Sequence, residues 1–112
     1  METETEQLGA VRIAKQVLET IIEMAALKEP GVVRLASVGG HFSRLLDREA
    51  PRRGIALTLA DQEVGVALYL VVESGSNMVQ VATAVQDAVG AAIEHMVGLT
   101  VKEINVYIQD VA

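Results

Sequence analysis

Cysteine and tryptophan are absent from this chain of 112 residues, and aromatic residues make up only 3% of it. Without cysteine there is no disulfide, no thiolate-bound metal and no cysteine nucleophile. So few rings disfavour nucleic-acid modules that stack bases on aromatic side chains. The two histidines, His41 and His95, are far apart and neither has a further ligand at the spacing of a zinc site. We therefore expect no metal site and no cofactor.

Positive charge is also scarce, because nine Lys and Arg residues stand against fifteen Asp and Glu, a formal net charge of −6. Phosphate backbones and anionic lipid repel such a chain unless its cations cluster. No apolar run approaches the length of about 20 residues that a membrane-spanning helix needs. The acidic start, METETEQLG, lacks the apolar run of a signal peptide. We expect a cytoplasmic protein that neither inserts into a membrane nor binds nucleic acid.

Motifs for catalysis or phosphate binding are missing as well. The sequence contains no G-x-G-x-x-G, no P-loop lysine and no G-x-S-x-G. Residues 74–77 precede a predicted helix, whose free N–H groups can hold an anion. Ordinary helix caps need the same residue types, so a cap is the simpler interpretation. We expect no enzymatic activity.

The hydrophobic share of 51% suits one domain with an aliphatic core, and residues 1–8 form an acidic tail that we expect to be flexible. The organising element of the domain, residues 9–112, is a long helix within Ser74–Leu99. Apolar residues recur there at steps of three and four, which predicts a stripe from Met78 to Met96 that lies in the core. Ser76 or Asn77 can cap its start, and Gly98 suits a left-handed residue at its end.

Alternating and helical patterns predict the other elements. These are strands over 9–13, 32–35, 55–59, 64–73 and 104–108, a helix over 14–27 and a short helix in the insert 37–54. Strands 55–59 and 64–73 should form an antiparallel hairpin. Strands 64–73 and 104–108 should pair in parallel through the long helix between them. We predict a two-layer α+β fold, a mixed β-sheet with both main helices on one face.

Short motifs in this order resemble a bacterial family. They are Gly9-x-Val11-x-Ile13, Pro30-Gly31-Val32, Gly54-Ile55, Met96-x-Gly98-Leu99-x-Val101 and Ile104-Asn105-Val106. Together they resemble the alkaline shock protein, or envelope stress response, family. The chain departs from that family at Glu73-Ser74-Gly75, where members usually carry Tyr-Gly. The resemblance implies a non-enzymatic cytoplasmic protein of cell-envelope homeostasis, in some members held at the membrane by a separate anchor protein.

The back of the predicted sheet is a candidate contact surface. If the face with Leu68 and Val106 packs on the helices, then Tyr69, Val71 and Tyr107 face away from them. A partly apolar surface with two of the three aromatic residues suits self-association. A one-sided sheet facing water tolerates scattered Tyr and Val equally well, so both interpretations stay open.

The insert carries a second candidate surface, formed by four cations. These are Arg44, Arg48, Arg52 and Arg53. Asp47 and Glu49 dilute the cluster, which favours a solvated loop with local ion pairs over a binding patch. If it is a patch, the net charge of the chain suits an acidic surface on a partner, or another copy of this chain, better than nucleic acid.

These observations predict an assembly or adaptor protein of the cell-envelope stress response. It would form homo-oligomers and dock to a membrane-anchored partner, which would place it at the inner face of the membrane. The alternative is a small KH-like nucleic-acid-binding module, which the acidity and the lack of a basic G-x-x-G loop disfavour. A small-ligand binder would need convergent polar groups around a pocket, and no residues stand out for that role.

Overall fold

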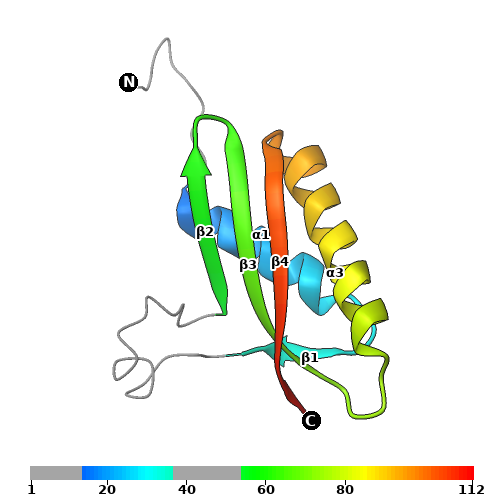
Figure 1. Ribbon diagram of the computed structural model, residues 1–112. Helices are drawn as coiled ribbons and strands as arrows, with labels where there is room; N and C mark the ends of the chain where they lie inside the picture. Colours follow the sequence, from blue (N-terminus) through cyan, green and yellow to red (C-terminus); the bar gives the residue numbers. More distant parts are fainter. Residues whose placement is uncertain (1–13, 37–53) are drawn as a thin grey trace, which may run out of the picture.

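The computed structural model describes residues 14–36 and 54–112. In chain order they form α1 (Lys15–Leu27), β1 (Val32–Leu35), β2 (Ile55–Ala60), β3 (Glu63–Val72), α3 (Met78–Ala92), a π-helical turn η1 (Ile93–Val97) and β4 (Thr100–Val111). The predicted strand over 9–13 and the predicted short helix of the insert lie outside the described residues. The other predicted elements are present, and they build the predicted α+β fold (Figure 1).

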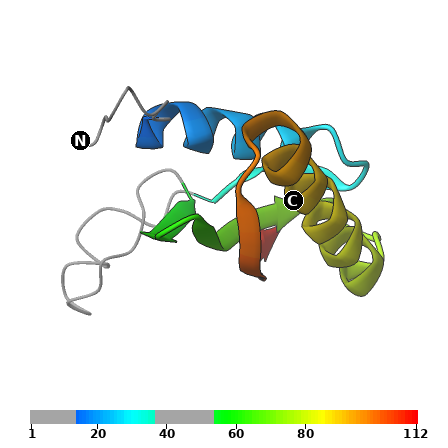
Figure 2. The ribbon, with the colours of Figure 1, turned by 90° about the horizontal axis from the view of Figure 1, so that it is seen from above.

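Strand β3 is the centre of a mixed four-stranded sheet. β2 pairs antiparallel with its first half and β1 pairs antiparallel with its last residues. β4 runs parallel to β3 along its whole length, so β1 and β2 share the opposite edge of β3. The predicted hairpin and the predicted parallel crossover are both confirmed. In Figure 1, α1 crosses behind the strands and α3 runs alongside β4, and Figure 2 shows α1 on one side of the sheet.

Strand β4 extends well beyond the predicted range of 104–108. Its register against β3 shifts twice, first between Val64 and Gly65 and again between Leu70 and Val71. Each shift leaves one residue of β4 without a partner in β3, namely Lys102 and Gln109. Such bulges break the alternation of inward and outward side chains on both sides of 104–108. That is why the alternating pattern marks only the middle of the strand.

The core lies between the helices and one face of the sheet. Its buried residues come from α1, from alternate positions of β3, from β2 and from α3 with η1: Leu18, Ile22, Ala26, Ile55, Val64, Val66, Leu68, Leu70, Val72, Val81, Val85, Val89 and Ile93. All are aliphatic, as the composition predicts. Ile104, Val106 and Ile108 of β4 pack against the same cluster. Both helices therefore cover one face of the sheet, which confirms the predicted two-layer arrangement.

The prediction that the apolar stripe of the long helix is buried from end to end is wrong. Met78, at the first turn, is 46% exposed, and Met96 is 70% exposed. Met96 lies in η1, where the amide of Gly98 donates to the carbonyl of Ile93 at 3.0 Å, a spacing of five residues. Because a π-helical turn holds more residues than an α-helical one, the 3.6-residue pattern no longer identifies the buried face there.

The two ends of the long helix match the predicted caps. At the start, Asn77 is the cap, because its Oδ1 accepts a hydrogen bond from the amide of Gln80 at 3.0 Å. The hydroxyl of Ser76 donates instead to the carbonyl of Glu73. At the end, Gly98 has φ +81°, the left-handed conformation predicted for it. The structure thus settles the choice between Ser76 and Asn77.

We expect Asn77→Ala to lower the free energy of unfolding by about 1 kcal/mol, because it removes the acceptor for an amide at the first turn of α3. Asn77→Asp keeps an acceptor and should stay close to the parent protein. Urea unfolding followed by circular dichroism measures both changes. Equal losses in the two variants would contradict the capping role.

In the part of the chain that the structure describes, no helix is long and apolar enough to span a membrane.

On the outer side of β4, the side-chain amide Nε2 of Gln86 donates to the carbonyl of Ile104 at 3.0 Å. Helix α3 therefore binds directly to the free edge of β4, in addition to packing on the core. This contact blocks part of a strand edge that would otherwise be open to another chain.

Candidate self-association surface on the sheet

The face of the sheet that points away from the helices carries a stacked pair of tyrosines. The parallel register places Tyr69 of β3 directly beside Tyr107 of β4. Their ring centroids are 5.0 Å apart and their planes differ by 19°. Tyr107 is 46% exposed and Tyr69 is partly exposed. Stacked rings of this kind contribute about 0.5–1.5 kcal/mol beyond their buried area.

Next to this pair the sheet has a floor of small residues. Ala67 of β3 pairs with Ala56 of β2, and Gly65 of β3 pairs with Thr58. A Cβ atom on Gly65 would lie 2.5 Å from Oγ1 of Thr58, so the backbone approaches that hydroxyl too closely for any side chain. The two rings therefore stand beside small residues at Ala56 and Ala67, whereas Gly65 is buried and has the side chains of Thr58 and Glu103 against it.

Val71 does not add to this surface. It follows the Tyr69 position on the same face of β3, as predicted, but it is only 2% exposed. In the register it lies between Arg34 of β1 and Asp110 of β4. Of the three sheet residues that the sequence proposes as contacts, only the two tyrosines are therefore accessible.

The four arginines of the insert lie outside the described residues. The residues on either side of that insert, however, meet on β3. The amide of Ala36 donates to the carbonyl of Tyr69 at 2.7 Å, and the amide of Tyr69 donates to the carbonyl of Gly54 at 2.9 Å. Ala36 and Gly54, the described residues on either side of the insert, thus both bind the backbone of Tyr69.

Among the residues that the structure describes, no group of three or more His, Cys, Asp or Glu side chains is arranged to hold a metal ion. The tyrosine face presents aromatic rings, small apolar side chains and hydroxyl groups, with the carboxylate of Glu103 beside Gly65.

The fold and this face define a small two-layer α+β domain with a partly aromatic sheet surface that neither described helix covers. The chain belongs to the alkaline shock protein 23 family, which is described as having a cell envelope-related function and whose profile matches residues 3–112. The family resemblance drawn from the short motifs is thereby confirmed.

Relatives are similar over most of their length. The uncharacterized protein YqhY of Bacillus subtilis (strain 168) is 31% identical over 112 residues, covering 96% of this chain and 81% of the relative. The uncharacterized protein Spy1614 of Streptococcus pyogenes serotype M6 is 28% identical over 106 residues, covering 92% of this chain and 88% of the relative. A solved structure of the MamM CTD is similar with a TM-score of 0.55 and 15% identity, covering 87% of this chain and 99% of that one. At that identity the likeness shows the fold alone.

Proposed function

We propose that this protein is a non-enzymatic assembly or adaptor domain with a cell envelope-related role. It self-associates through the tyrosine face of its sheet and docks to a membrane-associated partner, which holds it at the inner face of the membrane. The observation that carries the self-association is the stacked pair of Tyr69 and Tyr107, accessible on a face that neither described helix covers. The family's cell envelope-related description supports the setting.

The shape of the face suits contact with a second copy. A twofold axis parallel to the plane of the sheet would set the raised rings of one copy over the small residues Ala56 and Ala67 in the other. Such an isologous contact uses the same patch twice and closes as a dimer. A sheet face three strands wide and ten residues long covers on the order of 500 Å², from a rise of about 3.3 Å per residue and a strand spacing of about 4.8 Å. Stable interfaces bury about 800 Å² per partner, so we expect a weak, reversible dimer.

Sedimentation equilibrium at protein concentrations up to about 1 mM tests this self-association, since weak dimers populate only in that range. The parent chain should show a monomer–dimer equilibrium. Tyr107→Glu should raise the dimer dissociation constant at least about tenfold, because it buries a charge in the contact. Val79→Glu places the same charge at an exposed apolar position on α3, on the other layer, and should change nothing. A parent that stays monomeric, or equal effects of the two variants, would contradict the proposal.

A further inference from the structure

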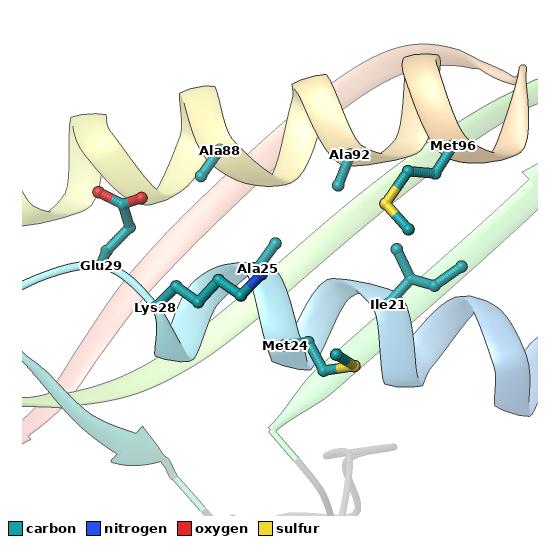
Figure 3. A pocket seen from close by; sticks show the side chains of 8 residues that line it. All are labelled: Ile21, Met24, Ala25, Lys28, Glu29, Ala88, Ala92 and Met96. Carbon is teal, nitrogen blue, oxygen red and sulfur yellow. The ribbon is translucent and has the colours of Figure 1, made fainter.

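The helix layer carries a groove that the sequence does not predict. A hollow of about 260 Å³ lies between the two helices and is lined by Ile21, Met24, Ala25, Lys28, Glu29, Ala88, Ala92 and Met96. Figure 3 shows Ala88, Ala92 and Met96 pointing from α3 and η1 toward α1. Six of the eight lining residues are apolar, and the two charged ones follow each other at the end of α1.

Two local features open this groove. Ala25, Ala88 and Ala92 leave space between the helices where longer side chains would meet. The π-helical turn η1 then carries Met96 off the buried face, so that it borders the groove. Across the groove, Met24 is 55% exposed. Turns of this kind are rare and frequently mark functional sites.

The size of the groove decides what class of ligand it fits. Sites for cofactors and drug-sized ligands enclose about 300–1,000 Å³, whereas a cavity of about 150 Å³ holds one benzene. A groove of this volume therefore suits one large apolar side chain presented by a protein segment. Its two methionines favour the same ligand, because thioether side chains are flexible and adapt to the shape of an inserted group.

The charge around the groove decides between a second copy and a different partner. The helix layer carries two cations and five acids: Lys15, Lys28, Glu19, Glu23, Glu29, Asp87 and Glu94. Two such layers face to face would bring like charges together, which opposes a homodimer through this side. A basic partner is attracted to the same surface. A helix that lays an apolar stripe into a groove is a common mode of recognition.

We propose that the groove between α1 and α3 receives an apolar anchor side chain from a basic amphipathic helix of another protein. This inference rests on the proposed function, because it supplies the site for the docking partner. The groove lies on the helix layer and the tyrosines lie on the opposite face of the sheet, so a dimer formed through Tyr107 leaves both grooves accessible.

Methionine methyl NMR tests the groove directly, since the chain has only four methionines. The probe is a synthetic Leu/Lys amphipathic peptide of about 18 residues, long enough to form a helix. The methyl signals of Met24 and Met96 should shift saturably as this peptide is added. Met78 lies outside the groove and should stay in place. A scrambled peptide of the same composition, which has no apolar stripe, should leave all of them unchanged.

A matched pair of variants tests the anchor. Ala88→Leu fills the groove and should weaken binding of the Leu/Lys peptide at least about tenfold, which corresponds to about 1.4 kcal/mol. Ala91→Leu makes the same change at an exposed position of α3 outside the groove lining and should have no effect. Circular dichroism confirms that both variants are folded.

The proposal is overturned if the scrambled peptide or a Leu/Glu amphipathic peptide binds as tightly, or if the two variants behave alike. It is also overturned if concentrating the protein alone shifts Met24 and Met96, because a second copy would then occupy the groove. Failure here differs from failure of the self-association, which depends on Tyr107 and is measured without peptide.

Discussion

Leu68→Ala is expected to lower the free energy of unfolding by about 2–5 kcal/mol, the range for truncating a buried leucine. Leu68 is completely buried in the central strand, with Ile55 of β2 on one side and Val106 of β4 on the other. Removing its side chain leaves a cavity between the sheet and both helices. Domains of this size are stable by only about 5–15 kcal/mol, so the variant loses a large share of its stability.

Leu59→Ala is the matched control for this change. Leu59 belongs to the same hairpin and pairs with Val64, but it is half exposed. The same chemical truncation there should cost less than about 1 kcal/mol, since little buried surface is lost. Urea unfolding of the two variants beside the parent gives both values. Similar midpoints for Leu68→Ala and Leu59→Ala would show that the face of β3 under the helices is not the core.

The sequence predicts the central part of this fold because local patterns determine it. The alternation through Val66, Leu68 and Leu70 sets which face of β3 is buried, and a strand–helix–strand unit allows one handedness. The same patterns fail where the backbone departs from regular geometry. The bulges hide the ends of β4, and the π-helical turn moves Met96 out of the predicted core. Both departures depend on tertiary packing, which no local spacing records.

The tyrosine face and the groove differ in how far the sequence predicts them. The sequence predicts that Tyr69 and Tyr107 share the outer face of the sheet, and the parallel register in the structure places them side by side. The groove requires the packing of α1 against α3, and its lining residues are spread over both helices. In retrospect, Met24 and Met96 point to the groove, because each stands at the edge of the apolar stripe of its helix. The burial of Val71 likewise depends on packing that alternation does not record.

Several motifs that relate this chain to its family are structural rather than chemical. Gly54 directly precedes β2 and has φ +78°, and Gly98 ends the long helix with φ +81°. Both conformations are unfavourable for residues that carry a Cβ atom. These two glycines of the motifs therefore lie at junctions of the fold.

Gly54→Ala should be the most damaging of the glycine substitutions. A left-handed conformation alone costs alanine about 1–2 kcal/mol. A Cβ atom at Gly54 would also lie 2.6 Å from the carbonyl oxygen of Ala36 and 3.1 Å from that of Tyr69, so the backbone must move. That movement weakens the hydrogen bonds that join Ala36, Tyr69 and Gly54, each contributing about 1 kcal/mol. We expect a total loss of about 2–4 kcal/mol.

Gly75→Ala separates the two causes. Gly75 has φ +89°, but no atom lies within 4 Å of an added Cβ, so only the conformational cost remains. Urea unfolding should place Gly75→Ala between the parent and Gly54→Ala. Hydrogen exchange at the Tyr69 amide should accelerate in Gly54→Ala under native conditions, because this amide donates to Gly54 itself. If the two glycine variants are equally stable and the Tyr69 amide stays protected in both, the close contacts at Gly54 do not add to its conformational cost, and the prediction is wrong.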